Sequence, residues 1–479
     1  MKNLIKSTVV ALAATIAFQP TVLTAQDLNI QERKVHRRGI EAITWSMPLI
    51  NFMAMRDGLK KDAGVGFNDV VYNSKVQTWR LQVTTANNTT PYVFIFWNVK
   101  DGPVVIDIPP SADGVALFGT LMDAWQRPLE DVGAKGMDQG RGAKYAIFPP
   151  GYEGPLPAGY VSSVQKTYNG YTLMRPIIAN ASDANLKKAE AIVKKIKVYP
   201  LAQADHPPAT KYIDIYNKNI DGVAHFDASY FDKLNSIIQE EVIERKDLAM
   251  MGLLKSIGIE KGKPYEVDAR RTEILADAAK EAHEFLIDLY FNSGLTGSFY
   301  DNRRWSVLTP ATAAQTGVTF ELPGYLDIDG RGGSYYAFFT SVKNFNLFNP
   351  PTMYLLASKD KDGQQLSGSE NYKLTVPKDV PVEEFWSVIV YTTEDATWFD
   401  NQPKAGVASS DRGLQVNKDG TVDVYFGSKA PVGKEANWVP TTPGKDYFLY
   451  FRLYGPKAPL FTKTWRLNDV DKLTAATSR

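Results

Sequence analysis

The stretch DYFLYFRLY, residues 446–454, places one arginine among aromatic rings. Successive side chains of a β-strand point to opposite faces, so Phe448, Tyr450, Arg452 and Tyr454 share a face. A guanidinium group stacks on rings and donates paired hydrogen bonds to a carboxylate or to sugar hydroxyls. We therefore take Arg452, Tyr450 and Tyr454 as candidate ligand-binding residues. The alternative is a structural arginine that pairs with a local acid between two sheets.

A second group of candidates combines large rings with amide, carboxylate or guanidinium groups. Rings of this kind stack on the apolar faces of sugars, while the polar groups bind the hydroxyls. The pattern therefore indicates carbohydrate binding. The alternative is that the tryptophans fill the ends of a β-sandwich. These candidates are Trp125, Arg127, Trp398, Asp400, Asn437 and Trp438.

The sequence offers no specific catalytic or cofactor motif, since its two S-x-x-K matches, at residues 163–166 and 358–361, are not at clear helix starts. It has no cysteine, and its four histidines are not spaced as metal ligands. A G-x-S-x-G elbow and a phosphate-binding P-loop are also absent. We therefore predict no metal and no cofactor, and assign no catalytic residue. Acidic residues near one strand keep a glycosidase-like hydrolase with paired carboxylates open as an alternative: Glu383, Glu384, Glu394, Asp395 and Asp400.

Residues 1–25 have the pattern of a secretory signal peptide. Lys2 and Lys6 precede the apolar run 9–18, and small residues follow near a plausible cleavage site. The run is shorter than the roughly 20 residues that span a bilayer, so we expect no transmembrane segment after signal removal. The expected location is the periplasm or outside the cell. With 54 basic and 53 acidic residues, the chain offers no electrostatic reason to bind nucleic acid.

The periodicity of apolar residues divides the rest of the chain into three regions. Residues 26–200 read as an N-terminal β domain with a leading helix that is interrupted near Pro48. Residues 201–297 read as a helical connecting segment, and residues 298–479 as a C-terminal jelly-roll-like β domain. The predicted fold is mainly β (α+β), with two jelly-roll-like antiparallel β-sandwich domains. Within the last region, GGSYYAFFTSV (residues 332–342) is predicted to be a strand.

Two long motifs resemble an exported bacterial family. They are DGPVVIDIPPSADGVALFGTLMDAWQRPLEDVGAKG in the N-terminal half and GSKAPVGKEANWVPTTPGKDYFLYFRLYGPKAPLFTKTWR in the C-terminal half. The family pairs two domains of unknown function, numbered twelve fifty-four and twelve fourteen. The resemblance extends over nearly the whole mature chain. It implies two β domains of jelly-roll type around a helical segment, and it implies no reaction.

These observations predict an exported protein that binds a carbohydrate or a small organic ligand through aromatic and arginine side chains. One alternative is a periplasmic hydrolase, which requires facing carboxylates in a deep pocket. Another is a structural or assembly protein of the cell envelope, with apolar surface patches and self-association into a homo-oligomer.

Overall fold

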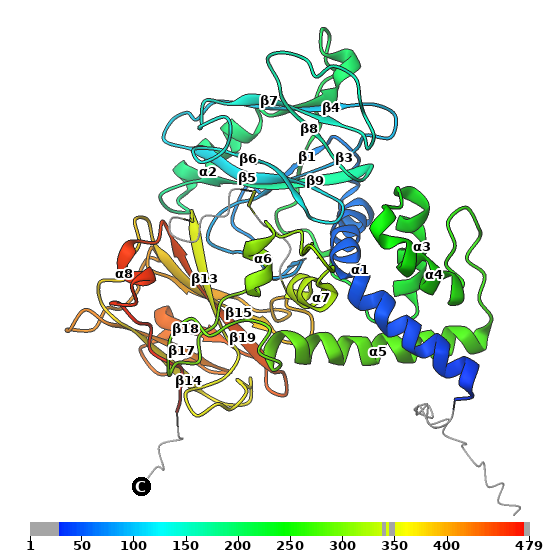
Figure 1. Ribbon diagram of the computed structural model, residues 1–479. Coiled ribbons are helices and arrows are strands. Elements are labelled where there is room, and N and C mark those ends of the chain that lie inside the picture. The colour runs from blue at the N-terminus through cyan, green and yellow to red at the C-terminus, as the bar shows by residue number, and fades with distance from the viewer. Residues whose placement is uncertain (1–27, 338–341, 344–349, 474–479) are drawn as a thin grey trace, which may run out of the picture.

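The structure is a computed structural model that describes residues 28–337, 342–343 and 350–473. The predicted signal peptide, residues 1–25, lies outside the described residues. Helices and strands occupy similar shares of the chain, so the fold is mixed α+β and the prediction of a mainly β chain is corrected (Figure 1). Within the described ranges, no helix combines the length and apolar character that crossing a membrane requires.

The helices lie mainly in the first half and the middle of the chain. Asn29 begins the first one with a capping box that includes Glu32, and Asp268 caps the fifth by accepting a hydrogen bond from the Arg271 amide. The helices are α1 (Ile30–Ala63), α2 (Asp183–Val193), α3 (Ser229–Glu240), α4 (Leu248–Ser256), α5 (Ala269–Phe291), α6 (Ala311–Gln315), α7 (Ile328–Ala337) and α8 (Ala458–Phe461).

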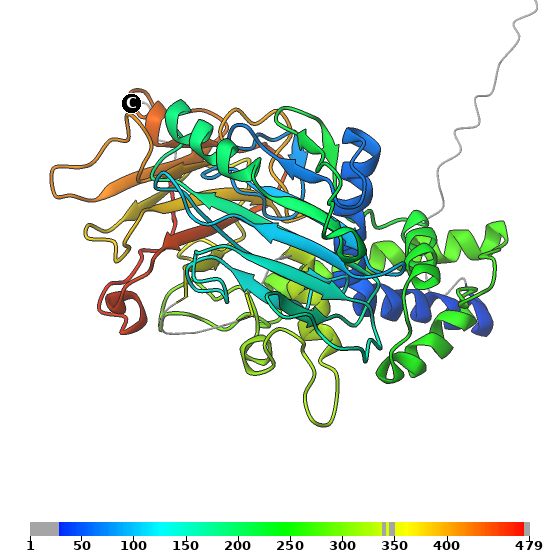
Figure 2. The same cartoon turned by 90° about the horizontal axis from the view of Figure 1, so that it is seen from above.

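The N-terminal sandwich consists of a six-stranded sheet, in the order β11-β1-β3-β9-β5-β6, and a four-stranded sheet, in the order β10-β4-β7-β8, which share one apolar core. A separate pair joins β2 to β12. Figure 2 shows the strands from above, with α1 beside them. The strands are β1 (Val70–Tyr72), β2 (Leu81–Gln82), β3 (Val93–Asn98), β4 (Val104–Ile108), β5 (Ala116–Asp123), β6 (Pro128–Val132), β7 (Ala143–Phe148), β8 (Val161–Val164), β9 (Asn169–Ile177), β10 (Lys197–Pro200), β11 (Tyr212–Asp214) and β12 (Ile220–Asp221).

The C-terminal sandwich consists of two four-stranded sheets around a second core. Their orders are β13-β19-β15-β16 and β18-β17-β14-β20. The strands are β13 (Thr352–Ala357), β14 (Tyr372–Val376), β15 (Trp386–Thr392), β16 (Gly406–Ala408), β17 (Val422–Gly427), β18 (Trp438–Pro440), β19 (Tyr447–Tyr454) and β20 (Asp471–Lys472).

The sandwiches are not purely antiparallel, which corrects a second part of the predicted fold. The pairs β1–β11, β2–β12, β7–β8 and β17–β18 are parallel. In two of these pairs, strands β11 and β12 of the predicted helical segment bind strands β1 and β2 of the N-terminal region. Parallel pairing needs a long connection between the strands, and the chain between β2 and β12 supplies one. The predicted division of the chain at residues 200 and 297 stays a prediction.

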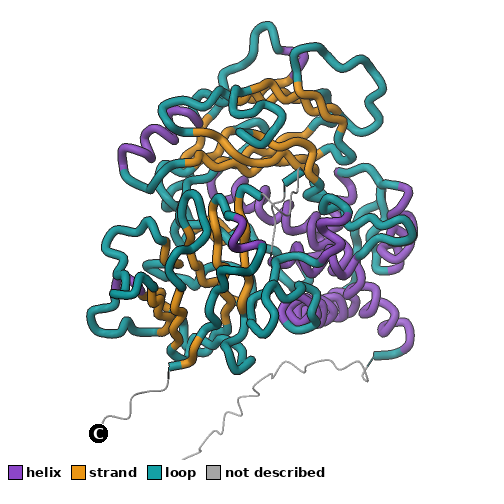
Figure 3. Tube along the Cα trace, turned by 60° about the vertical axis from the view of Figure 1, so that its left-hand side comes forward, coloured by secondary structure: helices purple, strands orange, loops and turns teal. Residues whose placement is uncertain are grey.

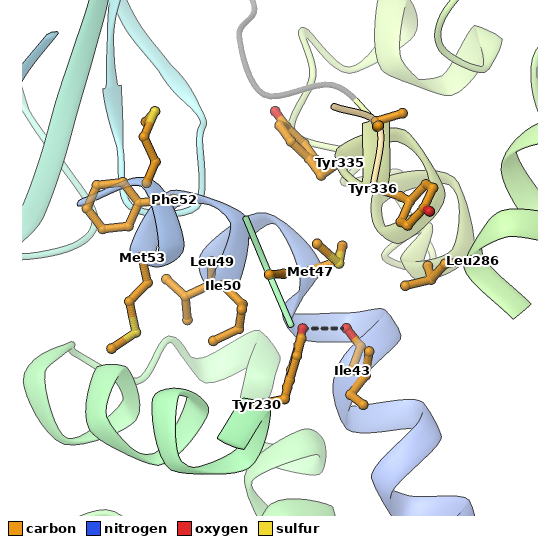
Figure 4. Packing of buried hydrophobic residues seen from close by; sticks show 14 of the residues in the cluster. Ile43, Met47, Leu49, Ile50, Phe52, Met53, Tyr230, Leu286, Tyr335 and Tyr336 are labelled. Atoms are coloured by element: carbon orange, nitrogen blue, oxygen red, sulfur yellow. Dashed lines mark hydrogen bonds between the residues drawn. The ribbon is translucent and has the colours of Figure 1, made fainter. Parts of the chain in front are cut away.

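A third and larger core, here called the central core, contains residues of both sandwiches and of the helices. Figure 3 shows the helices beside the two groups of strands. Strands β9 and β19 contribute to the central core with the faces that point away from their own sandwiches. Figure 4 shows Leu49 and Ile50 of α1 near Tyr230 of α3, whose hydroxyl donates to the Ile43 carbonyl (3.2 Å). The strand residues in this core include Phe94, Phe96, Tyr171, Leu173, Ile389, Tyr391, Phe448 and Tyr450.

Helix α1 continues through Pro48, so the predicted interruption at this residue is wrong. The helix changes direction near its middle in Figure 1. Proline has no amide hydrogen, and the carbonyl of Thr44 therefore lacks its usual helical donor. Burial on the central core holds the helix together across this position, since every residue from Ala42 to Met55 is buried.

The predicted strand at residues 332–342 is wrong for its first part, which belongs to helix α7; residues 338–341 lie outside the described residues. Two glycines let α7 approach its neighbours closely. A Cβ atom on Gly332 would lie 2.4 Å from the Thr44 carbonyl oxygen, and one on Gly333 would lie 2.6 Å from Leu295. Tertiary packing on α1 therefore overrides the strand preference of the aromatic residues that follow.

Gly58 of α1 packs directly against the backbone of β12. A Cβ atom there would lie 2.1 Å from the Asp221 carbonyl oxygen. We expect Gly58→Ala to lower the free energy of unfolding by about 1–3 kcal/mol, because the helix or the strand must move apart. The measurement is the midpoint of urea-induced unfolding.

The matched control is Gly252→Ala in α4, where no atom lies within 4 Å of an added Cβ. This change should raise the free energy of unfolding by about 0.5–1 kcal/mol through higher helix propensity. Equal effects of the two substitutions would contradict the close approach of α1 to β12.

Candidate functional site

A cavity of about 650 Å³ is lined by residues of both sandwiches and of the segment 297–318. Strands β5 and β9 contribute from the N-terminal side, and β13 and β19 from the C-terminal side. Its volume falls in the range of small-molecule binding sites. Most of the lining side chains are apolar, and they include Leu81, Val83, Phe94, Phe118, Leu173, Met174, Val307, Leu308, Pro310, Ala313, Val318 and Met353.

Arg452 lines this cavity from β19, although only 3% of the residue is exposed to solvent. Its Nη2 atom donates to the Thr85 carbonyl oxygen (2.8 Å) and to the Tyr391 hydroxyl oxygen (2.6 Å). Its guanidinium carbon lies 4.7 Å from the ring centre of Tyr354 and 5.7 Å from that of Tyr450. The predicted face of the strand, with a guanidinium group among rings, is confirmed. The opposite face packs in the core of the C-terminal sandwich, as predicted.

Arg175 lines the same cavity from β9, and 5% of the residue is exposed. It continues the face of β9 that carries Tyr171 and Leu173 into the central core. Its guanidinium carbon lies 5.1 Å from the ring centre of Phe118 and 5.3 Å from that of Tyr454. Each sandwich therefore contributes one arginine to the cavity lining, and this arginine belongs to a buried inner strand.

Tyr354 of β13 joins the two arginines. It stands directly opposite Arg452 in the strand register, and it also interacts with Arg175. Burial raises the pKa of Tyr354. The positive charges of Arg175 and Arg452, together with side-chain hydrogen bonds to Thr352 and Arg175, lower it by more, so its pKa lies below the ordinary value for tyrosine. The two guanidinium groups therefore create a strongly positive environment around this hydroxyl.

The charges of the two arginines have no carboxylate partner among the described residues. Neither guanidinium group forms an ion pair, and the described cavity lining contains no aspartate or glutamate. Burial by itself lowers the pKa of Arg452. Neighbouring tyrosines, above all Tyr391 and Tyr354, raise this pKa by more, so the Arg452 side chain stays charged. The prediction of a local acid as its partner is therefore not met in the described chain.

Two other predicted residues lie near the arginines but bind protein groups. The Tyr450 hydroxyl forms a hydrogen bond with the Tyr290 hydroxyl (2.8 Å) and donates to the Ala337 carbonyl (3.2 Å). The Tyr454 hydroxyl accepts from the Asn87 amide (2.8 Å). Neither tyrosine lines the cavity.

The tryptophan groups of the C-terminal region lie away from the cavity lining. Trp398 is buried, and exposed Asp400 accepts a hydrogen bond from Gln82 (3.2 Å). Asn437 is buried and donates to the carbonyls of Gln415 and Asp423 (both 2.8 Å), which ties two loops together. Trp438 is partly exposed and donates to the Gly427 carbonyl (2.9 Å).

Trp125 and Arg127 lie in a separate, ion-paired region. Arg127 pairs with buried Asp123 (2.6 Å) and with Glu244 (2.6 Å). The Trp125 ring lies under the guanidinium group of Arg331, 4.7 Å from its carbon. Both predicted residues are therefore engaged in contacts that join β5 and its turn to the helices.

Sequence reasoning missed Arg175 and Tyr354. A usable signal existed for the arginine, because Arg175 interrupts an apolar strand face in the same way as Arg452 does: Tyr171-x-Leu173-x-Arg175 parallels Phe448-x-Tyr450-x-Arg452. Tyr354 gave no such signal, since its importance comes from pairing with β19 across the sheet.

The ionisation of Tyr354 tests the arrangement of the two arginines. In alkaline titrations followed by tyrosinate absorbance, the difference between the wild type and Tyr354→Phe should show a component that ionises below the ordinary tyrosine pKa. Because the pKa is lower in the folded state than in the unfolded state, the contribution of Tyr354 to stability is lost as the pH falls through the folded-state value. The stability advantage of the wild type over Tyr354→Phe should therefore grow as the pH rises through this window.

The control is Tyr265→Phe, because burial raises the pKa of Tyr265 to about 12. The difference in tyrosinate absorbance between the wild type and Tyr265→Phe should appear only at higher pH. An equally late component for Tyr354 would rule out the proximity of the two guanidinium charges.

Comparisons with known proteins support the fold and leave the function open. The crystal structure of the VPA0106 protein from Vibrio parahaemolyticus has a TM-score of 0.54 at 16% identity, covering 92% of this chain and 100% of that one. The crystal structure of an uncharacterised protein from Burkholderia cenocepacia has a TM-score of 0.39 at 12% identity, with 92% and 95% coverage. At 16% identity, the similarity to the Vibrio parahaemolyticus protein concerns the fold alone. A search of curated proteins gives no match.

Two family models match separate parts of the chain, and both are described as proteins of unknown function. The DUF1254 model matches residues 67–200 in the N-terminal sandwich, and the DUF1214 model matches residues 351–458 in the C-terminal sandwich. The predicted resemblance is thereby confirmed for both halves. The chain therefore contains a region that matches the DUF1254 model, followed by a region that matches the DUF1214 model.

Proposed function

We propose that this protein binds a small, largely apolar organic molecule in the cavity between its two sandwiches. The observation that carries the proposal is the lining itself: apolar side chains from both matched domains surround about 650 Å³, with two buried arginines among them. A well-formed apolar cavity with a few convergent polar groups is the usual setting for a small-molecule ligand.

The cavity supports an apolar organic ligand over a carbohydrate. Arg452 is the one member of the nine predicted ligand-binding residues that lines it. A sugar site needs many hydrogen-bonding groups beside its rings, whereas most groups here are aliphatic. The predicted amide and ring sets, such as Asn437 with Trp438, are occupied by protein partners.

The hydrolase with paired carboxylates has less support. The described lining holds no aspartate or glutamate to serve as acid or nucleophile. Export to the periplasm or beyond remains part of the proposal, and it rests on the sequence of residues 1–25 alone. The jelly-roll-like arrangement of the two sandwiches also remains a proposal, as does self-association.

A neutral fluorescent probe tests the cavity. N-phenyl-1-naphthylamine is apolar and fluoresces strongly in an apolar environment. We expect saturable binding to the wild-type protein with one site per chain, and a loss of at least tenfold in affinity for Ala314→Trp, because the indole occupies space at the cavity wall.

The matched control is Ala184→Trp, the same change at an exposed position of α2 outside the cavity. It should bind the probe as the wild type does. Absence of saturable binding to the wild type, or equal losses in both variants, would overturn the proposed function.

A further inference from the structure

Two guanidinium groups from different domains meet beside one cavity without a compensating acid. Each belongs to a residue that is at least 95% buried, and both lower the pKa of the tyrosine between them. The residues outside the described ranges that lie nearest in sequence to the cavity lining are 338–341 and 344–349. Residues 338–349 contain no aspartate or glutamate. The protein chain therefore supplies tyrosine hydroxyls and a backbone carbonyl to these charges, and no carboxylate in its described part.

Burying a charge in a protein interior is strongly unfavourable unless it is paired and fully hydrogen-bonded. Arginine cannot lose its proton to escape this cost. Two like charges close together add repulsion to desolvation. The arrangement is therefore unfavourable in the empty protein and becomes favourable when a negative charge enters.

Unused hydrogen-bond donors point to the same conclusion. Three buried residues that line the cavity have a side-chain nitrogen without a hydrogen-bond partner: Nε of Arg175, Nε of Arg452 and the amide nitrogen of Gln77. All three are donors. A ligand that presents acceptor oxygens would satisfy them, whereas a purely apolar ligand would leave them unpaired.

On the basis of the proposed function, we propose that the ligand is an amphipathic anion. Its apolar body occupies the aliphatic part of the cavity, and its anionic oxygens, of a carboxylate or a phosphate monoester, bind Arg175 and Arg452 beside Tyr354. Guanidinium groups recognise both kinds of head group through charge-assisted hydrogen bonds. The two sandwiches would then be joined by the ligand, since each contributes one arginine.

Ligands with the same chain and different head groups test this proposal on the wild-type protein. Dodecanoate, dodecyl phosphate, dodecanol and dodecyltrimethylammonium each compete with N-phenyl-1-naphthylamine at pH 8. We expect at least one of the two anions to bind tenfold or more tightly than dodecanol, and the cation to bind most weakly. The ratio between the two anions identifies the preferred head group.

The outcomes separate the two proposals. If the probe does not bind at all, the proposed function fails. If the probe binds and dodecanol competes as well as both anions, the cavity binds ligands but the anion proposal is overturned.

Variants and a spectroscopic readout locate the head group. Arg175→Gln and Arg452→Gln should each weaken binding of the preferred anion by at least tenfold and leave dodecanol binding nearly unchanged. Arg141→Gln, at an exposed loop position, is the matched control. In the wild type, the anion should also raise the pKa of Tyr354 toward its ordinary value, because it neutralises the neighbouring charges, while dodecanol should not. Anion binding without either effect would place the head group elsewhere and overturn the proposal.

Discussion

The burial of strands β9 and β19 on both faces is the constraint that the rest of the structure depends on. One face of each strand packs in its own sandwich, and the other packs in the central core with the helices. A charged side chain on such a strand cannot turn to bulk water. Arg175 and Arg452 occupy these positions, so their compensation must come from inside the molecule or from a ligand.

The central core also explains how two β domains and a set of helices produce one cavity. Helix α1 packs with α5 and α7, and the same cluster includes residues from both sandwiches. The domains are thereby held with their outer faces toward each other. Where the faces do not meet fully, the segment 297–318 and β13 complete the wall. The site is thus a property of the assembled chain and of neither sandwich alone.

Alternation in a strand was predictable from the sequence because it is a local property, and the face shared by Tyr450 and Arg452 was found in this way. The helical form of residues 332–337 was not, because two glycines beside aromatic residues resemble a hairpin until packing on α1 is known. The placement of Trp398 and Trp438 could not be predicted from the sequence either, because composition does not tell whether a ring contacts a ligand or other groups of the protein.

The parallel pairing of β11 with β1 and of β12 with β2 bears on how the chain matures during synthesis. These partners are separated by more than a hundred residues, so both early strands leave the ribosome long before residues 212–221 do. In that interval, β1 has a free edge and β2 has no partner within its sheet. Unpaired strand edges recruit other chains, so a chain that lacks residues 212–221 would leave these edges open to intermolecular pairing.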